Sequence, residues 1–135
     1  MSRMYARCVA PWRSKSTIAA ALFVAVIFEC GASAHAHAFL DRASPAVGSS
    51  VHESPREVNL WFTEALEPVF SKIEVVDGTG RRVDRGDVKL DADDATILKA
   101  SLRPLAPGSY KVIWRVISVD THMTEGDYTF RLEPK

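Results

Sequence analysis

The strongest constraint on the fold is a pair of strand-like segments near the C-terminal end of the chain. Residues 109–118 and 126–132 both alternate inward-type apolar side chains with polar ones. In the first segment, one face carries Tyr110, Val112, Trp114 and Val116; in the second, one face carries Tyr128, Phe130 and Leu132. A period of two residues is typical of strands that bury one face. These segments therefore favour two neighbouring strands packed on a common core.

The same pattern recurs upstream in shorter runs. A further strand is predicted to begin at residues 38–40 and to end at the turn of residues 44–48. Others are predicted at residues 57–62, 72–76 and 96–99, with Val83 and Val88 marking two short candidates. Turn residues such as Gly, Pro and Asp separate these runs, and we find no helix of useful length after residue 37. We therefore predict an all-β domain: a Greek-key β-sandwich of about seven strands in two sheets.

The first 36 residues read as a secretory signal peptide. A basic stretch precedes an apolar run at residues 18–28, which is shorter than the roughly 20 residues needed to span a bilayer. Small residues follow, and cleavage after Ala36 would release an exported domain of residues 37–135. Cleavage after Ala34 is the alternative. We predict a periplasmic location for the released domain.

The domain left after cleavage is mildly acidic and lacks cysteine. The first 36 residues hold four of the 17 Lys and Arg and one of the 17 Asp and Glu, which leaves 13 basic and 16 acidic residues. This balance argues against nucleic acid as a partner. Cys8 and Cys30 are both removed, so the domain has neither a disulfide nor a thiolate ligand. It also has no phosphate loop and no nucleophile elbow, and we predict that it is not an enzyme.

Histidine is the residue type that points to a chemical role. After cleavage at Ala36, only His37, His52 and His122 remain. As the first residue, His37 offers an α-amine, with a pKa near ~8, and an imidazole that can chelate the same metal. Asp120 and His122 are expected in an extended segment, where both side chains can project to one side. An amine, two imidazoles and a carboxylate form a donor set that suits copper(II).

Other interpretations of these residues stay open. His37 could be a frayed chain end, and Asp120 with His122 could be a turn residue beside a solvated ring. Glu64 is either a loop carboxylate in water or an acceptor that orients an imidazole or the α-amine. We interpret His52 as a surface residue. We interpret Trp61 and Trp114 as packing residues and not as a binding platform.

The alternative cleavage site has a chemical consequence. A chain that starts His35-Ala36-His37 would place a histidine third. The amine, two backbone amides and an imidazole could then wrap copper(II) without help from Asp120 or His122.

Taken together, several of these segments resemble the CopC family of periplasmic copper-binding proteins. The resemblance rests on His37 with residues 44–48, on residues 60–64, on residues 105–122 ending in Ser-x-Asp-x-His, and on residues 126–130. It implies a cupredoxin-like β-sandwich and one copper(II) site made by His37, Asp120 and His122. Glu64 falls where the family has a carboxylate near that site. The spacing from His37 to Pro45 favours cleavage after Ala36.

The resemblance also implies a role in copper resistance or homeostasis. The domain would buffer copper(II) or pass it to an inner-membrane copper transporter of the CopD type, and we expect a monomer. Some members of the family carry a copper(I) site built from methionines. Residues 76–89 contain no Met and no His, and Met123 is the only methionine after residue 36. Because copper(I) prefers thioether ligands, we predict no copper(I) site.

Two other functions compete with copper(II) binding. A histidine brace also serves copper-dependent oxidases and monooxygenases, although Asp120 would fill a position that oxygen chemistry needs open. The third hypothesis is a β-sandwich interaction module that binds no metal.

Overall fold

The computed structural model describes residues 38–134 of the 135-residue chain. The predicted signal peptide, residues 1–36, and His37 lie outside the described residues. The strands are β1 (Leu40–Ser44), β2 (Ser50–Val51), β3 (Glu57–Phe62), β4 (Lys72–Asp77), β5 (Lys89–Leu90), β6 (Ile97–Ser101), β7 (Gly108–Ile117) and β8 (Met123–Leu132). The part of the chain that the structure describes contains no helix, and hence none with the length and apolar character needed to cross a membrane.

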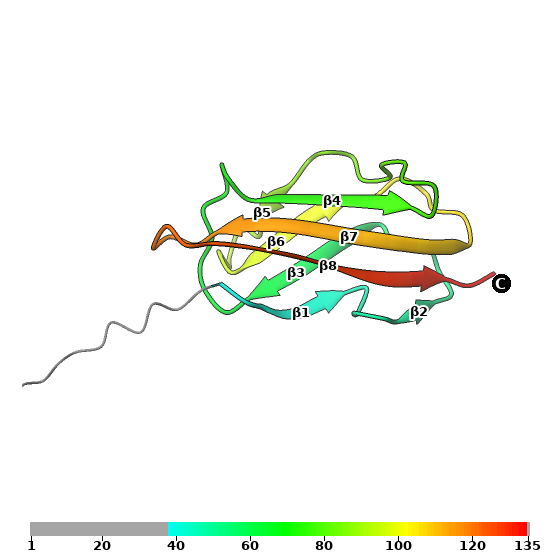
Figure 1. The fold of residues 1–135 in the computed structure, drawn as a ribbon, viewed down its shortest axis with the longest axis horizontal. Coiled ribbons are helices and arrows are strands. Elements are labelled where there is room, and N and C mark those ends of the chain that lie inside the picture. Colours follow the sequence, from blue (N-terminus) through cyan, green and yellow to red (C-terminus); the bar gives the residue numbers. More distant parts are fainter. Residues whose placement is uncertain (1–37, 135) are drawn as a thin grey trace, which may run out of the picture. The chain divides into compact units, whose positions relative to one another are not determined.

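The eight strands form two four-stranded sheets (Figure 1). One sheet has the order β1-β3-β6-β5 and the other the order β2-β8-β7-β4. The chain crosses between the sheets after β1, β2, β3, β4 and β6 instead of finishing one sheet first. The predicted all-β sandwich with Greek-key links is therefore confirmed.

The core lies between the two sheets and is built by the alternating faces of the strands. In β7 and β8 every second side chain is buried over most of the length of the hairpin. Phe62 of β3 meets Trp114 of β7 edge to face at 5.3 Å and joins the two sheets, whereas Tyr110 of β7 stacks on Phe130 of the neighbouring strand β8 at 5.4 Å. Such pairs add about 0.5–1.5 kcal/mol to the hydrophobic gain from burial.

The structure differs from the predicted strands in three places. The short strand predicted at Val83 is absent, because Arg82 and Asp84 on either side of it form only isolated bridges. The parallel strand β2 beside β8 was not predicted, because two residues are too few to show a period. Strand β8 begins at Met123 and not at Gly126. Gly126 was interpreted as a strand start because glycine is common in turns, but it lies inside β8, opposite Trp114 of β7.

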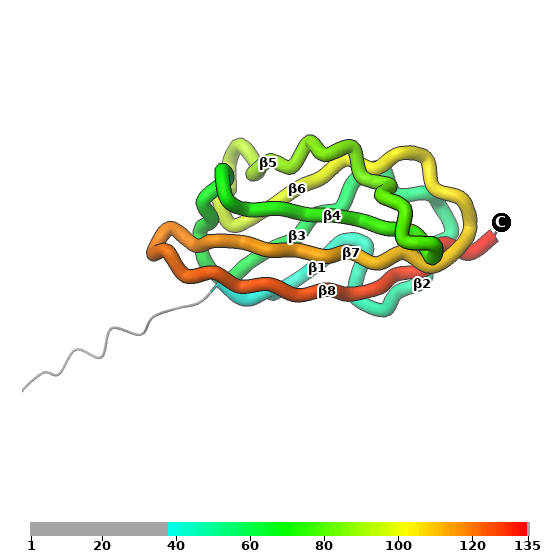
Figure 2. Tube along the Cα trace, turned by 45° about the horizontal axis from the view of Figure 1, so that its top comes forward, coloured from blue at the N-terminus to red at the C-terminus, as the bar shows by residue number. Residues whose placement is uncertain are grey.

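Four segments meet at one end of the sandwich, which we call the hairpin end: residues 38–41, 63–71, 91–96 and 118–124. In Figures 1 and 2 the β7–β8 hairpin lies at this end, together with the start of β1 and the end of β3, and the C-terminus lies at the other. Backbone hydrogen bonds join the segments, including Leu66 N–H to the Ala95 carbonyl at 3.0 Å and Val119 N–H to the Ala65 carbonyl at 3.0 Å.

Candidate metal centre

The turn between β7 and β8 holds Asp120 and His122, two of the three predicted site residues that the structure describes. Its first hydrogen bond runs from Thr121 N–H to the Ser118 carbonyl at 2.8 Å, and Ser118 N–H donates to the His122 carbonyl at 3.0 Å. Thr121 has φ of 73°, in the left-handed region that β-branched residues rarely adopt. The expectation of an extended segment from 120 to 122 is therefore wrong, because Thr121 reverses the chain between them.

The turn nevertheless brings the two side chains together. His122 Nδ1 lies 3.0 Å from Asp120 Oδ2. The turn therefore places an imidazole nitrogen beside a carboxylate oxygen.

Ser118 holds the carboxylate of Asp120 from the other side. Its side chain is fully buried, and its hydroxyl donates a hydrogen bond to Asp120 Oδ1. This bond lowers the pKa of Asp120; partial burial opposes the effect, and the adjacent His122 ring lowers the pKa further. Asp120 is therefore held as an anion next to the imidazole.

The loop between β3 and β4 supports the hairpin from one side. Leu66 bridges to Ser118, and Glu67 N–H donates to the Ile117 carbonyl at 2.8 Å. Ser71 extends this contact, because its hydroxyl donates to the Glu67 carbonyl at 2.7 Å and accepts from Ile117 N–H at 3.3 Å. The turn that carries Asp120 is thus fixed to a second segment by main-chain bonds.

The first described residues are tied to the same end. Ala38 is fully buried, and its carbonyl accepts a hydrogen bond from the Thr124 hydroxyl at 2.6 Å. Phe39 and Thr63 exchange two bonds, Phe39 N–H to Thr63 Oγ1 and Thr63 N–H to the Phe39 carbonyl, each at 3.0 Å. The chain next to His37 therefore lies against Thr124, two residues beyond His122, and against Thr63, which precedes Glu64.

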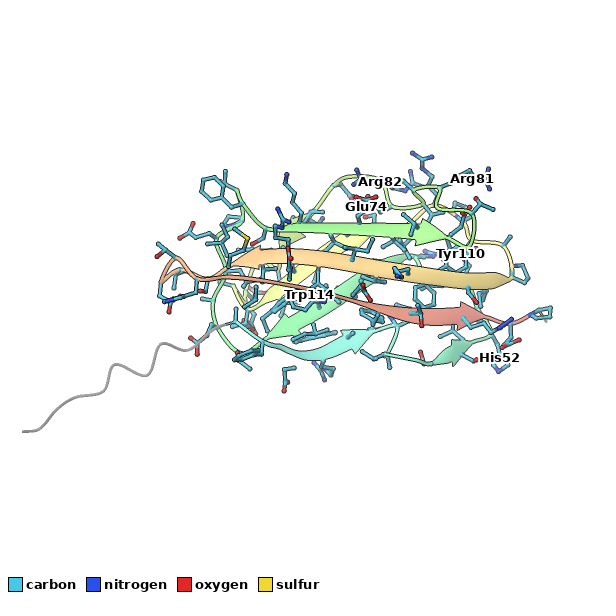
Figure 3. All side chains as sticks on the ribbon, viewed as in Figure 1. His52, Glu74, Arg81, Arg82, Tyr110 and Trp114 are labelled. Carbon is cyan, nitrogen blue, oxygen red and sulfur yellow. The ribbon has the colours of Figure 1, made fainter. Side chains whose placement is uncertain are left out.

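The other candidate residues have plainer surroundings. Within residues 38–134, no group of three or more His, Cys, Asp or Glu side chains is arranged to hold a metal, so Asp120 and His122 form a pair without Glu64. Glu64 is half-buried in the loop after β3, and His52 is exposed, at the other end of the sandwich in Figure 3. Trp114 is buried, and Trp61 is half-buried under the Arg42 guanidinium, 4.0 Å from the ring centroid, as expected of packing residues.

Three supporting residues were not singled out from the sequence: Ser118, Thr63 and Thr124. Each is a hydroxyl residue next to a candidate ligand or two positions from one. Their closeness in sequence to the candidate ligands could have pointed to a supporting role, but only weakly, because serine and threonine are common in turns.

The donor atoms of Asp120 and His122 suit a metal ion of borderline Lewis-acid hardness. It contains an imidazole and an anionic carboxylate at the exposed edge of a rigid hairpin, with side-chain exposures of 30% and 41%. Imidazole suits copper and zinc, and a mixed nitrogen and oxygen set suits copper(II).

Comparison with known proteins agrees with this chemistry. The family model described as CopC domain matches residues 40–133. The crystal structure of CopC from Methylosinus trichosporium OB3b superposes with a TM-score of 0.69 at 42% identity, covering 73% of this chain and 95% of that one. PcoC, a methionine-rich copper resistance protein from Escherichia coli, superposes with a TM-score of 0.63 at 30% identity, covering 73% of this chain and 100% of that one.

A third relative is much longer than this chain. Copper transport protein CutJ of Bacillus subtilis (strain 168) is 30% identical over 98 residues, which cover 72% of this chain and 18% of CutJ. PcoC is named for copper resistance and CutJ for copper transport. The chain described here therefore belongs to the CopC family, and its function is related to copper.

Proposed function

We propose that this protein is exported to the periplasm and holds one copper(II) ion at the hairpin end. Its ligands are the α-amine and imidazole of His37, exposed by cleavage after Ala36, together with His122 and Asp120. Glu64 acts as an acceptor that orients one of these groups or completes the ligand set. The proposal is carried by one observation: the hydrogen bond from Thr124 to Ala38 anchors the chain next to His37 beside the turn that holds Asp120 and His122.

Chain geometry strengthens this argument. Consecutive α-carbons are about 3.8 Å apart, so the proposal requires His37 to reach the turn only from Ala38, whose carbonyl is bonded to Thr124. A terminal histidine there supplies two nitrogen donors without help from any other segment. The pair formed by Asp120 and His122 supplies the remaining nitrogen and oxygen.

The proposed role is binding and transfer, without catalysis. An ion held by an amine, two imidazoles and a carboxylate has its equatorial positions filled, which disfavours oxygen activation. The donor set contains no thioether, and the exposed Met123 is the only methionine after residue 36. Copper(I) would therefore bind weakly, and copper(II) is the form that the protein buffers or passes to an inner-membrane transporter of the CopD type.

A competition titration with copper(II) tests the ligand set. Two chains are compared, one that begins at His37 and one that carries a single glycine before it. We expect the first to bind copper(II) more tightly by more than about tenfold, because the extra residue removes the α-amine from the chelate. Equal affinities would exclude the N-terminus from the site.

Matched histidine variants test the second half of the site. His122→Ala should lower the affinity for copper(II) strongly, whereas His52→Ala, at an exposed position, should leave it unchanged. The affinity should also fall between pH 7 and pH 4, because protons compete for the imidazoles, the amine and finally the carboxylate.

A thermal denaturation experiment distinguishes binding from a metal-free interaction module. A ligand that binds only the native state stabilises it by about 2.7 kcal/mol at 100 times the dissociation constant. Copper(II) should therefore raise the Tm of the chain that begins at His37. An unchanged Tm under saturating copper would favour the module without a metal.

A further inference from the structure

Exposed apolar side chains gather around the candidate metal centre. Seven large hydrophobic side chains are exposed among residues 38–134, and five of them belong to the hairpin end. These five are Phe39 (60% exposed), Val69 (77%), Phe70 (60%), Val119 (56%) and Met123 (56%). Val47 and Ile113, the other two, lie outside the four segments of this end. Exposed apolar side chains that cluster in this way mark interaction sites more often than scattered ones do.

The contacts described above bring these five side chains around one centre. Val119 lies in the metal-binding turn, and its N–H is bonded to the loop that carries Val69 and Phe70. Phe39 is bonded to Thr63 at the start of that loop. Met123 directly follows His122. These five side chains, which we call the apolar rim, therefore lie on the segments that meet at the hairpin end together with Asp120 and His122.

The same end is acidic. Its four segments contain the carboxylates of Asp41, Glu64, Glu67, Asp91, Asp93, Asp94 and Asp120, and they contain no Lys or Arg. The cations that border it are Arg42, which packs over Trp61, Lys72 at the start of β4, and Lys99, whose Nζ lies 2.5 Å from Asp91 Oδ2. In Figure 3, Arg81 and Arg82 lie toward the other end of the sandwich.

We propose that the hairpin end is the docking surface for a membrane-embedded copper acceptor whose outer face is apolar and carries Lys or Arg side chains. The inference rests on the proposed function. Copper leaves a site by ligand exchange, so the acceptor's donor atoms must reach the ion at Asp120 and His122. An acceptor that reaches the ion has to cover the rim, which buries the five apolar side chains.

The charge of this end selects a protein as the occupant. A bilayer with anionic lipids would repel this end, because its seven carboxylates outnumber the three bordering cations. A second copy docked end to end would place the same carboxylates against each other, and like charges across an interface disfavour the complex. A face that carries basic side chains is attracted to this end, and the apolar rim then supplies the buried contact.

Site-specific photocrosslinking in the native host tests the proposal. A photoreactive benzoylphenylalanine replaces Phe70 in the full chain, and the control carries it at Val47, which is equally exposed at 62%. Cells are irradiated in copper-containing medium, and the crosslinked product is identified by mass spectrometry. We expect the chain labelled at position 70 to crosslink to a multi-span membrane copper transporter, and the chain labelled at position 47 to give at most one tenth as much product.

A second variant and a vesicle assay complete the test. Val69→Ser should lower the yield of the crosslink at least tenfold while the copper(II) affinity of the chain stays within twofold. The copper-loaded chain should not sediment with vesicles of phosphatidylglycerol and phosphatidylethanolamine. Equal crosslinking from positions 47 and 70, no crosslink at 70, a crosslink to a second copy, or vesicle binding that requires Phe70 would each overturn the proposal.

The same experiment separates this inference from the proposed function. A chain that binds copper(II) but does not crosslink through position 70 refutes the docking surface alone. A chain that crosslinks to the transporter but fails to bind copper(II) in the titration refutes the proposed ligand set and leaves the docking surface standing.

Discussion

Gly126 lies on the inner face of β8, directly opposite Trp114 of β7. A Cβ added to Gly126 would lie 2.6 Å from Cζ2 of Trp114, 3.1 Å from Cε2 and 3.3 Å from Cη2. Carbon atoms in good contact are about 3.5–4.0 Å apart, so the overlap is close to 1 Å. The indole cannot withdraw easily, because it is buried and packs against Phe62 at 5.3 Å.

The size of the effect follows from two opposing contributions. Overpacking a buried site costs about 1–3 kcal/mol. Replacing glycine by alanine recovers about 0.4–1 kcal/mol by restricting the unfolded chain. We therefore expect Gly126→Ala to lower the free energy of unfolding by about 1–2 kcal/mol, because the steric overlap is the larger contribution. For a domain near 100 residues this corresponds to a drop in Tm of roughly 5–10 °C.

Urea denaturation followed by far-UV circular dichroism measures this difference on the chain that begins at His37. Gly78→Ala is the matched control, because the added Cβ would meet nothing nearer than the Ser109 carbonyl at 4.0 Å. In a Trp114→Phe background the cost of Gly126→Ala should shrink by about 1 kcal/mol, since the clashing atoms belong to the indole. The steric argument fails if Gly126→Ala behaves like Gly78→Ala, or if its cost is the same with phenylalanine at 114.

Three further predictions concern the buried carboxylate, the turn and its hydroxyl support. Asp84 accepts hydrogen bonds from Val75 N–H at 2.9 Å, Gly86 N–H at 3.0 Å and the Arg82 guanidinium at 2.7 and 2.9 Å. Asp84→Ala should therefore lower the free energy of unfolding by about 2–4 kcal/mol at pH 7, as measured by urea denaturation. Burial by itself would raise the pKa of Asp84, but these donors, Arg82 foremost, lower it overall. The stabilising contribution of Asp84 is therefore complete above the unfolded pKa of about 3.9 and is lost as the pH falls through the lower folded pKa. The difference in unfolding free energy between wild type and Asp84→Ala should narrow below pH 4, and a constant difference would contradict this assignment. Thr121→Gly should stabilise the domain by about 0.5–1 kcal/mol in the same assay, because glycine adopts φ of 73° without the cost that a β-branched residue bears. A loss of stability would show that the Thr121 side chain makes a compensating contact. Ser118→Ala should weaken copper(II) binding by about 10–100-fold in a competition titration by removing the donor that holds Asp120, whereas an exposed serine of β7, changed in Ser109→Ala, should have no effect.

The sequence by itself determined the fold class and supplied the donor atoms on which the proposed metal site rests. Period-two alternation predicted β3 with its observed bounds, 57–62, and placed the long strand at 109–118, within one residue of β7 at both ends. Such alternation is local, so it can be seen without knowing which strands pair. The donor types of His37, Asp120 and His122 are likewise properties of single residues, which is why copper(II) could be predicted before any contact was known.

The tertiary structure decided which segments meet. The hydrogen bond from Thr124 to Ala38 joins residues 86 positions apart, and nothing near either residue signals that contact. The strand that continues through Gly126 depends on the indole of Trp114, which occupies the space that a side chain would need. The gathering of apolar side chains at the hairpin end is also a property of the assembled loops, because Phe39, Phe70 and Met123 are isolated from one another in the sequence. Local patterns therefore specify strands and donor atoms, whereas pairing between distant segments specifies the site and the surface around it.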